Sequence, residues 1–257
     1  MSSPPAQTGA SAELALPEVE VTRCLDWLAR GWRDLARAPG VALAHGLTMA
    51  VFGALLFALA GHRFWFLAGA FSGFLLVAPV LATGLYAVSR AQERNEPAGF
   101  SLVLTTWLSG DLRQMLFGFL LGLSGTGWVL TSASLITLLS PLPVNGPADF
   151  FRHVVLADSY LFELWVLMGG LLAAPVFASS VIAMPMLLDR NVSVLTAVLT
   201  SWRVVIANPL PMAAWAAVIL FATALGMVTL LIGLVVLLPL IGHASWHAYR
   251  DLVKDAQ

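Results

Sequence analysis

Three of the five histidines lie in or beside apolar stretches, where an imidazole is an uncommon side chain. His243 and His247 are four residues apart, so both rings would project from one face of a helix. His45 lies a few residues inside another apolar stretch, which a helical hairpin could bring to the same depth. Imidazole nitrogens bind zinc, copper and haem iron. The spacing therefore makes His45, His243 and His247 the candidate metal ligands, with haem or copper as the candidate cofactor.

The same histidines have a structural interpretation, in which each ring forms hydrogen bonds between neighbouring helices. A pair of imidazoles is an incomplete ligand set for most metals. Alanine rather than glutamate follows His243, so the zinc-protease pattern is absent. No phosphate-binding loop, dinucleotide fingerprint or Cys-x-x-Cys motif occurs, and Cys24 is the single cysteine. We therefore predict no catalytic residues, no firmly assigned cofactor and no enzymatic activity.

The composition predicts a membrane protein. Of the 257 residues, 59% are hydrophobic and 11% are charged, whereas soluble domains carry roughly 25% charged residues. The net charge of −1 gives no basis for nucleic-acid binding. The partner that the composition indicates is the lipid bilayer, and further membrane proteins are the other candidate partners.

The chain from Val204 to Tyr249 contains no Lys, Arg, Asp or Glu over 46 residues. A helix needs about 20 residues to cross a bilayer, so this stretch fits two crossings and a turn. Similar stretches predict six membrane helices, at residues 41–60, 64–89, 115–139, 160–188, 209–225 and 230–249. The predicted fold is all-α and polytopic, with six transmembrane helices arranged as three hairpins. The hairpin units cover about residues 21–90, 91–190 and 191–254, and residues 1–20 are predicted to form a disordered cytoplasmic tail.

Amphipathic helices are expected at the membrane surface between the crossings, around residues 21–38, 100–107 and 193–207. In the first of them Leu25, Leu28, Trp32 and Leu35 share one helical face, and we expect Trp27 and Trp32 at the interface. Packing of this helix on the protein itself is the alternative. The residues that we expect to face lipid headgroups are Arg23, Arg30, Arg33, Arg37, Arg203 and Arg250.

The distribution of basic residues predicts the orientation. With both termini in the cytoplasm, all of the 13 Lys and Arg residues except Arg63 and Arg152 lie on the cytoplasmic side. The positive-inside rule favours this arrangement strongly.

Several motifs resemble a known family. These are APVLATGLYAVSR (residues 78–90), MPMLLDR (184–190) and PLIGHASWHAYRDLV (239–253). Together with Trp32-Arg-Asp-Leu and the Trp202 to Pro209 segment, they are similar to bacterial integral membrane proteins grouped as domain of unknown function 2189. The resemblance covers about residues 21–254 and implies a six-pass protein of the bacterial inner membrane with no established activity. Some members carry a cytochrome c oxidase subunit I-like label, but this chain has too few crossings and histidines for that role.

Three functions remain open from the sequence. The first is a non-enzymatic role in supporting or assembling other membrane components, such as a respiratory complex. The second is a channel or transporter for a neutral or amphipathic solute, because the third predicted helix is rich in Ser and Thr. The third is haem or copper handling by His45, His243 and His247.

Overall fold

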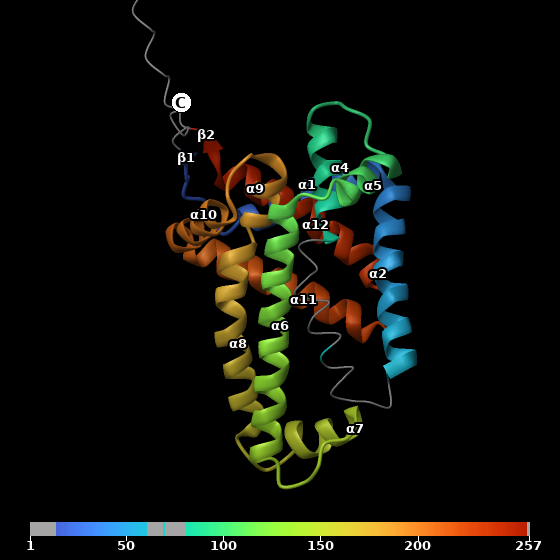
Figure 1. Ribbon diagram of the computed structural model, residues 1–257, viewed down its shortest axis with the longest axis vertical. Coiled ribbons are helices and arrows are strands. Elements are labelled where there is room, and N and C mark those ends of the chain that lie inside the picture. The colour runs from blue at the N-terminus through green and yellow to red at the C-terminus, as the bar shows by residue number, and fades with distance from the viewer. Residues whose placement is uncertain (1–13, 61–68, 70–80, 256–257) are drawn as a thin grey trace, which may run out of the picture.

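The computed structural model describes residues 14–60, 69 and 81–255, and these are almost entirely helical (Figure 1). The first helices are α1 (Arg23–Arg37), α2 (Pro39–Ala60), α4 (Thr83–Glu93) and α5 (Phe100–Leu108). They are followed by α6 (Leu112–Leu139), α7 (Pro147–Phe150), a π-helical turn (Phe151–Val155), α8 (Leu161–Ser180) and α9 (Ala183–Asp189). The last helices are α10 (Val194–Ala207), α11 (Pro209–Val228) and α12 (Leu234–Leu252). This confirms the all-α prediction.

Within the described residues, four helical segments are long and apolar enough to cross a membrane. They are Pro39–Ala58, Leu112–Leu139, Leu161–Asp189 and Pro209–Val228. The predicted crossing at residues 64–89 lies mostly outside the described part of the chain. The predicted crossing at 230–249 is helical from Leu234 but is not among the four, because polar residues fill its second half. The count of six crossings and the three-hairpin arrangement are therefore not confirmed.

The fourth predicted crossing is two helices rather than one. α8 ends at Ser180 and α9 begins at Ala183. Pro185 explains the position of the break, because its ring clashes with the carbonyl four residues earlier, that of Val181, and it has no N–H to donate there. The backbone N–H of Ile182, which the break frees, donates to the Ser201 hydroxyl at 3.2 Å.

α12 lies at the centre of the helix assembly, against α1, α2, α4 and α11. Two glycines permit the close approach of its neighbours. A Cβ at Gly31 of α1 would lie 2.7 Å from the backbone nitrogen of Ala244, and one at Gly46 of α2 would collide with the carbonyl of Val235. Small residues at such crossings let helix backbones pack closely, so α1 and α2 hold α12 from two sides.

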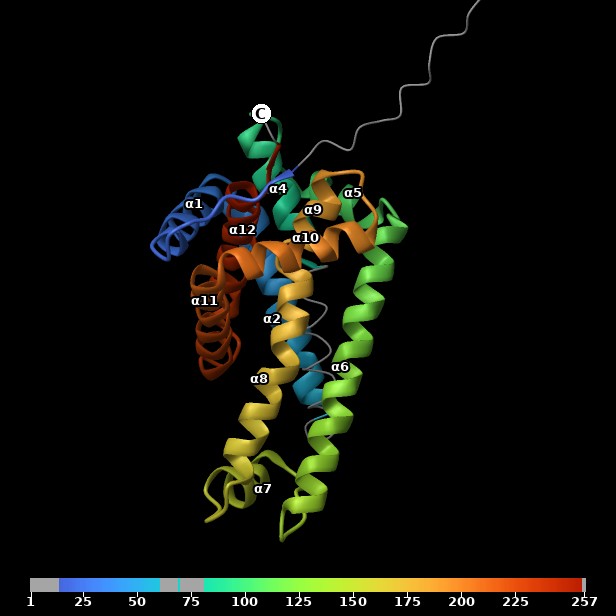
Figure 2. The same ribbon diagram turned by 90° about the vertical axis from the view of Figure 1, so that its left-hand side faces the viewer.

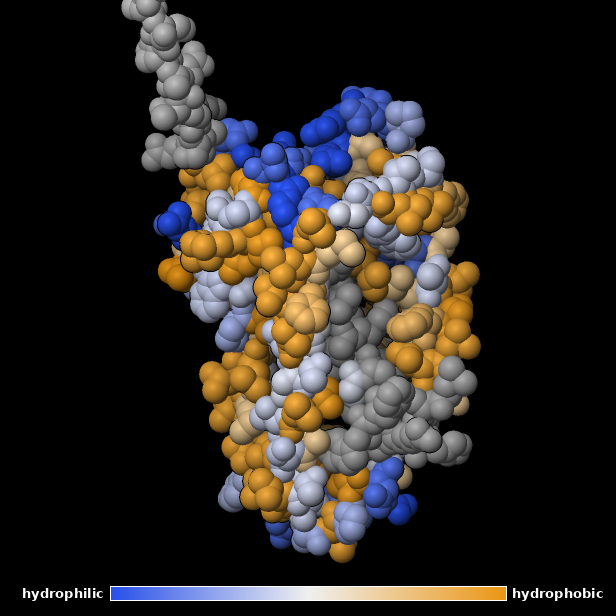
Figure 3. Space-filling model, viewed as in Figure 1, coloured by the Kyte–Doolittle hydropathy of each residue, from blue (hydrophilic) through white to orange (hydrophobic). Residues whose placement is uncertain are grey.

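The molecule has a polar end and apolar legs. Figures 1 and 2 show α4, α5, α9, α10 and the C-terminus at the upper end, while α6 and α8 extend along the long axis to α7. The largest buried core cluster combines residues of α1, α9, α10 and α12 with the adjoining ends of α6 and α11. Figure 3 shows hydrophilic residues at both ends and a broad hydrophobic surface between them. This distribution matches a protein whose middle lies in lipid.

Residues 14–20, which belong to the predicted disordered tail, contact the folded protein, whereas residues 1–13 lie outside the described part of the chain. Strand β1 (Leu14–Ala15) pairs antiparallel with β2 (Lys254–Asp255). The backbone N–H of Val19 donates to the Asn208 side chain at 2.8 Å, and Asn208 donates back to the carbonyl of Pro17 at 3.2 Å. The Asn208 side chain thus satisfies the backbone N–H of Val19 and the backbone carbonyl of Pro17. In a disordered tail these groups would bind water instead.

Candidate functional site

His247 lies between two carboxylates at the polar end of the molecule. Its Nε2 is 2.8 Å from Oδ2 of Asp34 on α1, and its Nδ1 is 3.6 Å from Oε1 of Glu93 on α4. The imidazole and Asp34 are both buried, whereas Glu93 is partly exposed. His247 thus connects α12 to α1 and α4 through polar contacts at two ring nitrogens.

Asp34 is an acceptor deep in the protein, with 4% of its surface exposed. Burial by itself raises the pKa of this carboxyl, but hydrogen bonds with His247 and Ser89 outweigh it and hold the pKa below the usual value. The Gln92 side chain also donates to the backbone carbonyl of Asp34 at 3.1 Å. Hydrogen bonds to the charged form favour the carboxylate, so Asp34 remains ionised inside the contact between α1, α4 and α12.

His243 lies one helical turn before His247 and faces Ser89 of α4. The Ser89 hydroxyl and His243 Nδ1 are 2.8 Å apart, and both residues are fully buried. A serine–imidazole pair is the geometry of an activated nucleophile. Here neither group is accessible to a substrate, so the arrangement serves as an interhelical hydrogen bond.

His45 occupies a different environment from the other two histidines. It is 5% exposed on α2, and its ring lies against Trp107, with 5.3 Å between the ring centroids. Neither of its ring nitrogens has a hydrogen-bond partner within the described ranges, and the same holds for Nε2 of His243. Burying a polar atom without a hydrogen-bond partner costs free energy. Among the three histidines, His45 and His243 therefore bear this cost and His247 does not.

The predicted shared metal site is not formed by the described residues. No group of three or more His, Cys, Asp and Glu side chains among them could hold a metal ion. His247 is occupied by Asp34 and Glu93, while His45 packs on Trp107. The described residues therefore give no support to joint ligation by His45, His243 and His247, and metal or haem binding by these histidines stays a prediction.

A second polar cluster surrounds Asp189 at the end of α9. The Tyr249 hydroxyl donates to Asp189 at 2.9 Å and accepts from Arg190 Nε at 2.9 Å. Arg250 lies 3.6 Å from Asp189 and 3.4 Å from Glu93, which joins this cluster to the histidine network. Charged residues at the ends of several helices are visible in the sequence, but nothing in it indicates that these ends meet, because the paired residues are as much as 157 positions apart.

The basic residues that we expected to face lipid fall into two groups. Arg30 and Arg250 bind within the protein: Arg30 contacts both carboxylate oxygens of Asp251, whose other hydrogen bond comes from the Trp27 indole at 2.9 Å. Arg23 and Arg37 are exposed and lie 3.2 and 3.8 Å from Asp26 and Asp34. Arg33 and Arg203 are exposed and form no ion pair with the described residues.

Trp27, which we expected to contact the membrane interface, is fully buried within the protein. Its ring packs edge-on against Trp215 of α11, with centroids 5.4 Å apart. Trp32 is exposed, as expected for an interfacial residue. α1 therefore combines both interpretations: one face packs on the protein and another remains free.

Comparison with known proteins finds one family to which the middle of the chain is similar. Residues 66–189 match the model of a family described as predicted integral membrane protein, DUF2189. No curated protein and no solved structure matches the chain. The match includes the APVLATGLYAVSR motif and all of the MPMLLDR motif except its last residue, Arg190. The chain is therefore a multi-pass integral membrane protein, and its residues 66–189 are similar to DUF2189, a family of unknown function.

Proposed function

We propose that this protein is a non-enzymatic membrane protein that supports or assembles other membrane components. One observation carries the proposal: the side chains with chemical potential are buried and connect helices. Asp34, Ser89, His243 and His247 are each less than 9% exposed, and each is hydrogen-bonded to another of the four. A catalytic group must reach its substrate, and these groups instead join α12 to α1 and α4.

The surface supports the same proposal. Large apolar side chains are exposed along α2, α6, α8 and α11, so these helices have wide faces available to lipid or to other membrane helices. One cavity along the described residues is an apolar groove between α11 and α12, and another lies at the Ile136 to Asn145 turn. Neither of these two cavities is lined by a histidine, and neither lies between α6 and α8, the third and fourth predicted crossings. The transporter alternative thus gains no support.

We place the polar end, and with it both termini, in the cytoplasm of a bacterial inner membrane. The β1–β2 pairing supports a common side, because it brings residues 14–15 next to residues 254–255. All basic residues of the described chain except Arg152 belong to the helices and loops of this end or to its strand β2. Such an excess of basic residues favours the cytoplasmic side.

The proposal is tested by purifying the full chain from its native membrane in mild detergent. We expect a membrane protein to be recovered with the wild type in a reproducible ratio. The matched variant is Ser89→Ala/His243→Gln, which removes the serine–imidazole pair but leaves the exposed helix faces unchanged. A supporting role predicts that the folded fraction of this variant retains the partner.

Metal and haem content, measured on the same two preparations, separates this proposal from its competitor. We expect both proteins to be colourless and free of stoichiometric metal. Stoichiometric copper or a haem absorption band in the wild type, lost in the variant, would contradict the supporting role and establish cofactor handling. Repeated purification of the chain without any partner would also count against the proposal.

A further inference from the structure

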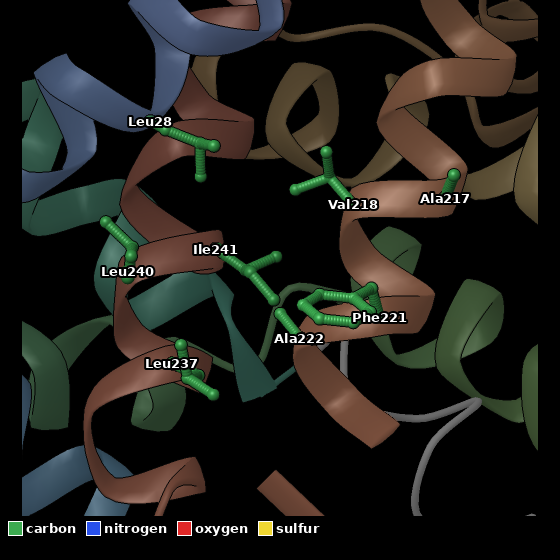
Figure 4. Close-up of a pocket in the computed structure, with 8 residues that line it drawn as sticks. All are labelled: Leu28, Ala217, Val218, Phe221, Ala222, Leu237, Leu240 and Ile241. Carbon is green, nitrogen blue, oxygen red and sulfur yellow. The ribbon is translucent and has the colours of Figure 1, made fainter. Parts of the chain in front are cut away.

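An open groove runs between α11 and α12, with α1 across one end (Figure 4). Leu28 of α1, Val218 and Phe221 of α11, and Leu237, Leu240 and Ile241 of α12 line it together with two alanines. Figure 4 shows Leu28 at one end of the groove and Leu237 at the other. The cavity volume is about 440 Å³, in the roughly 300–1,000 Å³ range of small-molecule sites. Its length and lining suit a flexible hydrocarbon chain.

The position of the groove specifies the medium around it. α11 is one of the four helices that are long and apolar enough to cross a membrane. Phe221 and Ala217 line the groove and are exposed at the surface of α11. The groove therefore opens to the medium around this helix, which for a membrane-crossing helix is the bilayer core. None of the lining side chains carries a polar atom that could orient a water-soluble ligand. An acyl chain, which needs only apolar contact, is the chemically matching occupant.

α1 specifies the depth at which the groove ends. At 100° per residue, Leu25, Leu28 and Trp32 fall within a sector of about 60° on this helix. Leu28 reaches the groove, while Leu25 is 68% and Trp32 52% exposed. An apolar stripe of this kind on a surface helix lies at the boundary between headgroups and acyl chains. A lipid whose chain occupies the groove would therefore hold its phosphate at the level of α1.

The charge of α1 favours an anionic headgroup. The helix contains four arginines and two aspartates. Arg33 follows the apolar stripe on its exposed side and forms no ion pair with the described residues, whereas Arg30 is bound to Asp251. An arginine bound to no carboxylate can form charge-assisted hydrogen bonds with a phosphate.

We propose that the groove between α11 and α12 binds one acyl chain of an anionic phospholipid whose phosphate is bound by Arg33. This site is independent of the supporting role proposed above, since it requires neither a protein partner nor the histidine network. It would give the protein a fixed lipid at its cytoplasmic interface.

The test is photo-crosslinking of the full chain in phosphatidylethanolamine vesicles that contain a minority of phosphatidylglycerol with a photoactivatable acyl chain. Labelled peptides are mapped by mass spectrometry. We expect labelling to concentrate on α11 and α12 and to fall severalfold in Ala217→Trp, which fills the groove from an exposed position. Ala173→Trp, an exposed site on α8, is the matched control and should leave the labelling of α11 and α12 unchanged. Thermal unfolding in detergent verifies that both variants fold.

Binding of the phosphate headgroup by Arg33 is tested with the variant Arg33→Gln. The control is Arg203→Gln, which removes another exposed arginine that forms no ion pair with the described residues. One arginine near a membrane surface changes anionic-lipid binding about fivefold, and we expect that loss only in Arg33→Gln. Equal labelling by phosphatidylglycerol and phosphatidylcholine probes would overturn the anionic headgroup. Even labelling of all apolar helices, unchanged by Ala217→Trp, would overturn the site and leave only the general lipid annulus.

Discussion

The polar end around α12 and the leg formed by α6 and α8 differ in how their polar side chains are hydrogen-bonded. In the leg, Ser124, Thr126 and Thr131 donate to carbonyls of their own helix, four residues back, and are largely exposed. At the polar end, Asp34, Ser89 and the two histidines of α12 bind across helices instead. Hydroxyls that are satisfied within one helix leave it free to face lipid, whereas groups satisfied across helices fix their relative positions.

One polar contact joins α6 to α8 within the leg, and it differs in kind from the contacts of the polar end. The Trp165 indole of α8 donates to the Ser132 hydroxyl of α6 at 2.6 Å. Both are neutral, and the surrounding contacts are aromatic, including Trp128 with its centroid 5.6 Å from that of Trp165. At the polar end the corresponding contacts involve carboxylates, imidazoles and guanidinium groups. The comparison predicts that the polar end depends much more strongly than the leg on individual polar residues.

The largest effect is expected from His247→Leu. This substitution leaves the buried Asp34 carboxylate without its nearest partner, and removing one member of a buried pair costs about 3 kcal/mol or more. We expect a clear fall in the thermal unfolding temperature in detergent. The double variant Asp34→Leu/His247→Leu should recover much of the loss, because it removes both polar groups. A double variant no more stable than the single one would contradict this account of the network.

Acid should weaken the polar end before the leg. Burial raises the pKa of Asp251, but hydrogen bonds from Arg30 and Trp27 outweigh it, so the net pKa is lowered, as it is for Asp34. A lowered folded-state pKa gives stability that is fully present above the unfolded value of about 3.9. That stability is lost as the pH falls through the folded-state values.

We therefore expect unfolding temperature to decline below about pH 4 in the wild type. The variant Asp34→Asn/Asp251→Asn should start from a lower stability at neutral pH and show a shallower decline. The measurement is thermal unfolding of both proteins across the acid range in the same detergent. Parallel pH curves for the two proteins would show that these carboxylates are not the titrating groups.

The smallest effect is expected in the leg, from Ser124→Ala/Thr126→Ala. Both hydroxyls are exposed and bond only to their own helix, and surface substitutions of this kind usually change stability by less than about 0.5 kcal/mol. The unfolding temperature should therefore match that of the wild type. A large loss would mean that α6 uses these hydroxyls in contacts between helices, which would remove the distinction between the two regions.

Several features of the fold could be predicted from the sequence because they depend on local chemistry. Long charge-free stretches placed α2, α6, α8 and α11, since a bilayer imposes both length and composition on a helix. The first and last residues of the helices were less predictable. The last helix was expected from Leu230, but Leu230 and Leu231 have positive φ and form the turn before α12, which starts at Leu234.

The functional interpretation of the histidines was less predictable than the helices. Spacing correctly grouped His243 and His247 on one face of α12, but their partners Ser89 and Asp34 come from 154 and 213 residues away. Nothing in the local pattern distinguishes an imidazole that binds a metal from one that binds a carboxylate. Likewise, the periodicity of α1 indicated an apolar face containing Leu35 but not that Trp27 would pack against Trp215.

The sequence by itself determined that this is an all-α integral membrane protein, because hydrocarbon tolerates only segments whose backbone groups are satisfied internally and whose side chains are apolar. Tertiary structure alone decided that α12, whose second half is polar, is the central helix of the polar end. That outcome depends on Gly31 and Gly46 admitting α1 and α2, and on Asp34 and Ser89 matching His247 and His243. Such complementarity belongs to pairs of distant residues and exists only once the helices are packed.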